Sequence, residues 1–336
     1  MTPFDILPPA AGTHVPLVID SPHSGTDYPA DFAPAVPLDA LRQAEDSHVD
    51  ALYADAPARG ATLIAAKFPR AYIDPNRSLL DIDASLLAAP WPGPAIPSRK
   101  TELGIGLIWR VLDDKTPIYG RKLTVDEVKR RIVEFHQPYQ RAVKKAIDEV
   151  HDHFGVVYHL NVHSMPAVSS AISEEGPGVA RADFVLGDRD GTTCEPAFTK
   201  LVAETLRGMG YDVKVNDPYK GVELVRAFSD PKAGRHSLQV EVNRRLYMDE
   251  RTRARSPGFE KLRANLARLV ERVAEYAGEK SAGHVHDHGH HHHHGHDHHH
   301  GHDHGHGHDH DHDHGHDHGH DHGHPHDHDP DHKHKH

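Results

Sequence analysis

The 336-residue chain has only one cysteine, Cys194. A single cysteine cannot form an intrachain disulfide, which excludes a disulfide-stapled fold and favours a reducing compartment. No apolar run approaches the roughly 18 residues that a membrane-spanning helix needs. The chain also does not start with a charged and then apolar segment, the pattern of a secretory signal peptide. We therefore expect a cytoplasmic protein that does not act at a membrane.

An excess of basic residues is absent too. The chain has 38 Lys and Arg against 50 Asp and Glu, for a net charge of −12 at pH 7. Residues 284–336 contribute −9 of this charge, so residues 1–283 are close to neutral. Nucleic-acid-binding proteins usually present a strongly basic face. We expect no nucleic-acid partner.

Histidine is abundant, and it is concentrated at the C-terminal end. Residues 284–336 contain 29 of the 38 histidines, separated mainly by Asp and Gly. A segment with almost no apolar residues cannot form a core and is expected to be disordered. Its imidazoles can bind Zn²⁺, Ni²⁺ or Cu²⁺. Only residues 290–294 resemble a purification tag, so our hypothesis is a metal reservoir or scavenger that serves a site within residues 1–283.

Residues 1–283 alternate short apolar runs with longer amphipathic stretches, which predicts one α/β domain with a sheet covered by helices. Strands are expected at 15–20, 62–66, 70–74, 156–162, 183–187, 211–215 and 237–243. Helices are expected at 38–57, 124–153, 193–208 and 257–277. In the second of these helices, Thr124 and Glu127 form a capping-box pattern and Pro138 predicts a kink.

Two segments of this domain lack a regular pattern. Residues 75–122 are rich in Pro and Gly and contain only short apolar runs. Residues 165–181 form a second expected loop. Long irregular segments in compact proteins are usually functional, so we expect a lid or a pocket wall.

Two histidines stand at matching positions. His23 and His163 each follow an apolar, β-branched run, and each is followed by serine. Such a turn places an imidazole at the carboxyl edge of the sheet, where open α/β sheets usually have their sites. A catalytic zinc ion typically takes three protein ligands and keeps one position open. We expect His23 and His163 to be two of these ligands.

The third ligand should be a carboxylate or another histidine. Asp46 lies in the helix expected at 38–57 and shares a helical face with Val49, so it would approach the sheet if that face packs inward. A solvated acidic helix explains the same spacing equally well. Glu45, on the neighbouring stripe, is a rival, and Asp27 is a weaker one.

Glu241 lies between Val240 and Val242 in a run typical of a buried strand. A carboxylate there is costly unless it is paired or functional, and burial raises its pKa towards that of a general base. An outward-facing charge on an edge strand is the simpler alternative. Glu241 also distinguishes an enzyme from the competing function, a metal-storage protein or metallochaperone with a degenerate hydrolase body. Such a protein needs ligands but no buried acid–base group.

Several arginines are candidates for anion binding. Arg77 follows Asn76 at a predicted strand exit, which suits bidentate recognition of a carboxylate. Arg110, Arg226 and Arg244 are further candidates.

Six sequence blocks, ordered between about Pro16 and Glu250, resemble the N-formylglutamate amidohydrolase family. These blocks are Ser21-Pro22-His23-Ser24-Gly25, Asp46 with residues 49–53, residues 73–77, Val162-His163-Ser164, residues 186–191 and residues 239–248. The resemblance implies a fold like that of the zinc carboxypeptidases, with a mixed central sheet flanked by helices. It also implies hydrolysis of N-formyl-L-glutamate to formate and glutamate.

The likeness to zinc carboxypeptidases extends to single residues. His163 resembles their late zinc ligand, Asn76-Arg77 their carboxylate clamp, and Glu241 their catalytic glutamate. One departure is that Thr26, not a glutamate, stands three residues after His23. The second ligand of the carboxypeptidase pattern must therefore come from elsewhere.

Asp46 fits the corresponding family block, which implies one zinc ion held by His23, Asp46 and His163. Glu241 would then move the proton, and Arg110 would stabilise the oxyanion while Arg77 holds the substrate carboxylate. Another N-acyl amino acid or a peptide is the alternative substrate for the same chemistry.

Overall fold

The computed structural model describes residues 2–287 of the chain. The expected metal reservoir lies almost entirely outside the described residues. Among the described residues, no helix is both long and apolar enough to span a bilayer.

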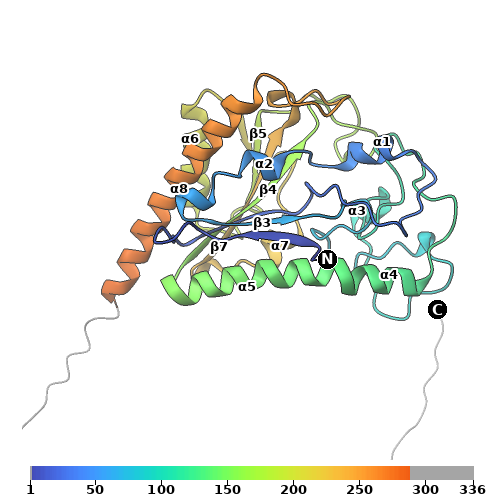
Figure 1. Cartoon of the computed structure of the whole chain (residues 1–336), viewed down its shortest axis with the longest axis horizontal. Coiled ribbons are helices and arrows are strands. Elements are labelled where there is room, and N and C mark those ends of the chain that lie inside the picture. Colours follow the sequence, from blue (N-terminus) through green and yellow to red (C-terminus); the bar gives the residue numbers. More distant parts are fainter. Residues whose placement is uncertain (1, 288–336) are drawn as a thin grey trace, which may run out of the picture. The chain divides into compact units, whose positions relative to one another are not determined.

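A seven-stranded mixed sheet forms the centre of the domain, in the order β1-β3-β2-β4-β7-β5-β6 (Figure 1). The strands are β1 Phe4–Leu7, β2 Leu17–Ser21, β3 Thr62–Ala66, β4 Val157–Met165, β5 Phe184–Gly187, β6 Val213–Val215 and β7 Arg235–Asn243. Strands β3, β2, β4 and β7 run parallel, whereas β1 and β5 are antiparallel to their neighbours β3 and β7. The expected α/β architecture with a mixed sheet is confirmed.

Helices cover both faces of the sheet (Figure 1). The α-helices are α1 Leu38–Leu41, α2 Val49–Leu52, α3 Arg99–Glu102, α4 Val125–Arg131, α5 Gln137–Phe154, α6 Pro196–Gly208, α7 Glu223–Ala227 and α8 Phe259–Asp287. Shorter turns of helix are η1 Arg42–Ala44, η2 Pro57–Arg59, η3 Ala84–Leu86, η5 Pro231–Ala233 and η6 Arg244–Leu246, and η4 Ile132–His136 is a π-helix. Helix α5 contributes to the core on one face, and α2, α6 and α8 contribute to the core on the other.

Two expected elements differ in the structure. Residues 70–72 form a turn instead of a strand, closed by the Tyr72 N–H, which donates to the Pro69 carbonyl at 3.0 Å. The chain bends again after Asp74, whose carboxylate accepts a hydrogen bond from the Asn76 backbone N–H at 2.9 Å. The helix expected at 38–57 is interrupted between η1 and α2. Glu45 is extended there, and His48 has a left-handed φ of 68°.

The other helices follow the expected pattern with local changes. Thr124 and Glu127 form the capping box at the start of α4. The disturbance expected from Pro138 takes the form of the π-helix just before it, because proline has no N–H to bond the preceding turn. Helix α8 continues to Asp287, so four residues of the segment expected to be disordered are helical. The edge strand β1 gave no alternating pattern and was not expected.

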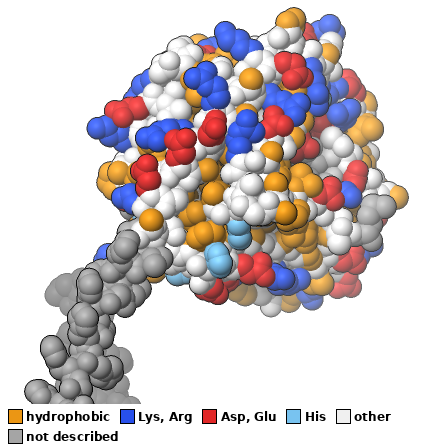
Figure 2. Space-filling model, turned by 60° about the vertical axis from the view of Figure 1, so that its left-hand side comes forward, with side chains coloured by type: hydrophobic (Ala, Val, Ile, Leu, Met, Phe, Trp, Pro, Cys, Tyr) orange, Lys and Arg blue, Asp and Glu red, His pale blue; other side chains and the backbone are white. Residues whose placement is uncertain are grey.

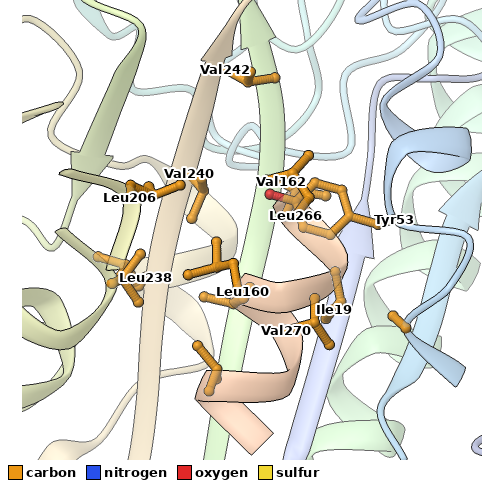
Figure 3. Close-up of a cluster of buried hydrophobic side chains, with 14 of the residues drawn as sticks. Ile19, Tyr53, Leu160, Val162, Leu206, Leu238, Val240, Val242, Leu266 and Val270 are labelled. Atoms are coloured by element: carbon orange, nitrogen blue, oxygen red, sulfur yellow. The ribbon is translucent and has the colours of Figure 1, made fainter. Parts of the chain in front are cut away.

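One face of β2, β4 and β7 is apolar and the other is polar where the site forms. Leu160, Val162 and Val240 point into the cluster formed with α8 (Figure 3). Because side chains alternate along a strand, Asn161, His163 and Glu241 point to the opposite face.

On the molecular face in Figure 2, acidic and basic side chains are interspersed, with apolar side chains between them.

Replacing Leu160 by alanine should lower the free energy of unfolding by about 2–5 kcal/mol, because the side chain is fully buried and leaves a cavity. Ile96, which is 66% exposed, is the matched control, and Ile96→Ala should change stability by less than about 0.5 kcal/mol. Urea unfolding measures both values. Equal effects of the two substitutions would contradict the assignment of Leu160 to the core.

Candidate active site

Three predicted ligand residues converge at the carboxyl edge of the sheet. His23 follows β2, His163 lies near the end of β4, and Asp46 lies in the break between η1 and α2. His23 Nδ1 and His163 Nδ1 are 3.0 Å apart, and Asp46 Oδ2 lies 3.3 Å from the first and 3.2 Å from the second. All three side chains are buried. The backbone also joins two of them, since Asp46 N–H donates to the His23 carbonyl at 3.0 Å.

The hydrogen bonds on the far side of each imidazole determine its tautomer. His23 Nε2 lies 2.7 Å from Asp74 Oδ1, a carboxylate oxygen that can only accept. His163 Nε2 lies 2.7 Å from Asn161 Oδ1, whose amide nitrogen donates to Asp20 Oδ1 at 2.9 Å. Both Nε2 atoms therefore carry the hydrogen, and both Nδ1 atoms present lone pairs.

The two imidazole lone pairs and the Asp46 oxygen are thus three acceptors with no hydrogen between them. Such a group is electrostatically unfavourable unless a cation binds it. Zinc–ligand bonds of about 2.0–2.1 Å in tetrahedral geometry place neighbouring ligand atoms about 3.3 Å apart. The observed separations of 3.0–3.3 Å fit this requirement. The residues present therefore fit a zinc ion with three protein ligands.

Asp46 is held with one oxygen towards the histidines. Its Oδ1 accepts from Arg244 Nη2 at 3.1 Å and lies 3.5 Å from Arg70 Nη1. Burial alone would raise the pKa of Asp46, but the nearby positive charge of Arg70 holds it well below its usual range. The carboxylate therefore stays ionised, as a metal ligand must.

The rival carboxylate, Glu45, does not point towards the histidines. It accepts hydrogen bonds from Tyr28 Oη at 2.9 Å, Arg42 Nε at 3.0 Å and Ser47 Oγ at 3.0 Å. Asp27 is exposed. The geometry therefore favours Asp46 over both alternatives.

Asp20 supports the site from beneath, and the sequence reasoning missed it. This buried carboxylate in β2 accepts from His159 Nε2 at 2.7 Å, Asn161 Nδ2 at 2.9 Å and Tyr139 Oη at 2.8 Å. It orients the Asn161 amide, which in turn orients His163. The sequence did contain a signal for this role, because Asp20 is a carboxylate at the end of the apolar run that forms β2.

Glu241 stands beside the three ligands. The parallel register of β4 and β7 pairs it with His163, and its Oε1 accepts from Gln239 Nε2 at 2.9 Å. Burial raises the pKa of Glu241 above its usual range, and the nearby negative charge of Asp46 adds to this rise, whereas the charges of Arg70 and Arg181 oppose it. A carboxylate with this position and raised pKa suits proton transfer.

A cavity of about 120 Å³ opens over these residues. His23, His163 and Glu241 line it. The expectation that residues 75–122 form a pocket wall is confirmed, since Asn76, Arg77, Lys100, Ile105, Trp109 and Asp113 line the cavity. The loop at 165–181 supplies a further wall, which includes Ser173, Glu174, Glu175 and Arg181.

Two of the four arginines expected at the site do line the cavity. Arg77 Nε donates to the Ile105 carbonyl at 3.1 Å, and its Nη1 donates to the Asn76 carbonyl at 3.0 Å. Arg244 donates to Ser164 Oγ, to the Glu45 carbonyl and to Asp46. These bonds let Arg244 position Asp46, and its expected role in anion binding stays a prediction.

The other two arginines lie elsewhere, and these expectations were wrong. Arg110 pairs with Asp83 at 2.7 Å and lines a separate surface hollow. Arg226 pairs with Glu223 on α7 and is 54% exposed. Each has a local acidic partner that keeps it away from the cavity.

Arg70 is a cavity arginine that the sequence analysis did not name. It follows β3 closely, stacks 4.9 Å from the Trp109 ring centre and contacts Asp74 at 3.0 Å. Its guanidinium lines the cavity. The sequence reasoning missed it because residues 70–74 resembled a strand, although Arg70 lies four residues after the real strand β3, much as His23 lies two residues after β2.

Comparisons with known proteins identify the family of the chain. A family model described as N-formylglutamate amidohydrolase matches residues 15–248. The chain is 28% identical over 278 residues to an N-formylglutamate deformylase of Pseudomonas aeruginosa, covering 80% of this chain and 96% of that protein. A second N-formylglutamate deformylase, from Pseudomonas putida, is 28% identical over 245 residues, covering 70% of this chain and 83% of that protein.

One solved structure gives the same assignment, and a second shares the fold. The crystal structure of an N-formylglutamate amidohydrolase from Ralstonia eutropha JMP134 is similar, with 51% identity and a TM-score of 0.79. The match covers 83% of this chain and all of that one. A protein from Agrobacterium tumefaciens shares the fold at 17% identity, with a TM-score of 0.58 over 85% of this chain and 97% of that one.

Asn161→Leu should weaken zinc binding by about 10- to 100-fold, because His163 loses the acceptor that fixes its tautomer and orientation. The measurement is the free Zn²⁺ concentration, set by a metal buffer, that gives half of the rise in melting temperature. Asn265→Leu on α8, at an amide that bonds Tyr211, is the control and should leave this concentration unchanged. An unchanged value for Asn161→Leu would show that Asn161 does not support the ligand.

Proposed function

Because the chain belongs to the N-formylglutamate amidohydrolase family, we propose that it is a zinc-dependent enzyme that hydrolyses N-formyl-L-glutamate to formate and L-glutamate. The observation that carries this proposal is the convergence of three acceptors next to Glu241 in a cavity lined by cationic side chains. A metal carrier has no use for a buried acid–base group beside its ligands.

His23, Asp46 and His163 would hold the metal. A bound zinc ion supplies Lewis acidity and lowers the pKa of water in its open coordination position to about 7. Asp74, Asn161 and Arg244 keep the three ligands in place through the bonds described above.

Glu241 carries the proton in this proposal. Its carboxylate accepts a proton from the attacking water and later donates it to the departing amine, so one group serves both halves of the reaction. Arg70, at the cavity wall, is positioned to stabilise negative charge that develops on the formyl oxygen. Arg77 supplies a cation for a substrate carboxylate.

The substrate is tested by the release of formate from N-formyl-L-glutamate, measured beside the hydrolysis of N-acetyl- and N-succinyl-L-glutamate. The proposal requires the highest kcat/KM for the N-formyl compound. A higher value for either larger acyl group would reassign the substrate within the same chemistry.

Glu241→Gln should lower kcat for formate release by about 10²- to 10⁴-fold, because glutamine keeps the shape of the side chain but cannot accept the proton. Zinc binding should persist, since Glu241 is not a ligand. Glu149→Gln, an exposed position on α5, is the control and should retain full activity. If Glu241→Gln keeps more than half of the wild-type kcat, the assigned role of Glu241 is wrong.

A further inference from the structure

The cavity contains two cationic corners, and each includes a cation, Lys100 or Arg181, to which the proposed reaction assigns no role. The first consists of Lys100 on α3 and Arg77. Burial lowers the pKa of Lys100 and the nearby charge of Arg77 lowers it further. The second is Arg181, whose guanidinium stacks on the Tyr219 ring at 5.1 Å and is only 3% exposed.

Each corner is neutralised by one of two consecutive glutamates in the loop at 165–181. Glu174 Oε1 lies 2.8 Å from Lys100 Nζ. Glu175 Oε1 accepts from Arg181 Nη2 at 2.7 Å and from its Nε at 3.2 Å. Both glutamates line the cavity. The loop therefore places two adjacent carboxylates on the two cationic corners.

The loop is held at its base, and near its tip Ile172 is only 5% exposed and packs in the core cluster. Val168 pairs with Ala180, and Arg181 N–H donates to the Ala167 carbonyl at 3.0 Å. Glu174 is 52% exposed, and ion pairs with such exposure are weak. Glu175 is 20% exposed, so both glutamate side chains reach the solvent, and competing carboxylates can displace these side chains while the loop backbone stays in place.

We propose that the two corners bind the two carboxylates of a dicarboxylic N-acyl amino acid, and that Glu174 and Glu175 occupy these corners until the substrate replaces them. Lys100 and Arg181 are then the specificity-determining residues of the cavity. This inference rests on the proposed amidohydrolase function for its kinetic test, but not for its binding test.

The kinetic test uses N-formyl-L-glutamate and two analogues. N-formyl-L-glutamine lacks the side-chain carboxylate, and 4-formamidobutyrate lacks the α-carboxylate. Lys100→Met and Arg181→Met should each lower kcat/KM for N-formyl-L-glutamate by about 10- to 100-fold, mainly through KM, because a charged hydrogen bond is lost. Each variant should have little effect on kcat/KM for the analogue that lacks the carboxylate bound at the substituted corner. One variant should therefore spare N-formyl-L-glutamine, and the other should spare 4-formamidobutyrate.

Two further variants separate charge recognition from structural damage. Arg181→Lys keeps a cation and should recover part of the loss seen in Arg181→Met. Glu174→Gln weakens the internal competitor and should lower KM for N-formyl-L-glutamate several-fold. Glu102→Gln, which removes an exposed partner of Arg99 on the same helix as Lys100, is the control and should leave KM unchanged.

The binding test uses glutarate, a dicarboxylate without an amide, and calorimetry on the full-length zinc-loaded protein. Glutarate should bind wild type and Glu102→Gln equally, and Lys100→Met and Arg181→Met at least ten-fold more weakly. Equal glutarate affinities in all four proteins, or equal kinetic losses on all three substrates, would overturn the inference. Failure of wild type to hydrolyse N-formyl-L-glutamate while glutarate binds as expected would refute the proposed function alone.

Discussion

The site depends on one constraint, which is that three acceptor atoms stand within 3.3 Å of one another and no hydrogen lies between them. Two imidazoles and a carboxylate cannot stabilise one another in this arrangement, because each presents a lone pair. A bound cation would remove the repulsion between these lone pairs, and the spacing suits a cation of the size of zinc. The surrounding hydrogen bonds maintain this arrangement of lone pairs, because they keep both imidazole hydrogens on the Nε2 atoms.

The fold supplies this constraint through the parallel strands of its centre. The register of β4 and β7 sets His163 beside Glu241, and β2 delivers Asp20 below and His23 above. The apolar sides of the same strands are anchored by α8 and its neighbours, so the polar edge is rigid. Residues 75–122 and 165–181 then close the cavity with side chains of both charges. The first segment supplies Arg77 and Lys100, and the second supplies Arg181 together with Glu174 and Glu175.

The sequence was informative where local patterns decide structure. Histidines at strand ends, the capping box at Thr124 and a carboxylate between Val240 and Val242 all predicted features that the fold contains. It was less informative where long-range contacts override the pattern. Arg110 had a suitable setting but pairs with Asp83, and residues 38–57 looked like one helix although the bond from Asp46 to the His23 carbonyl interrupts it. The support from Asp20 depends on contacts across 139 and 141 positions, which spacing along one chain does not show.

The most direct test removes all metal from the full-length protein with a chelator and measures formate release from N-formyl-L-glutamate as Zn²⁺ is returned. The wild type should be inactive without metal and recover with zinc. His163→Ala, verified as folded by circular dichroism, should not recover, although it keeps all 29 histidines of residues 284–336. Activity in the metal-free wild type, or full recovery of His163→Ala, would contradict a reaction centred on His23, Asp46 and His163.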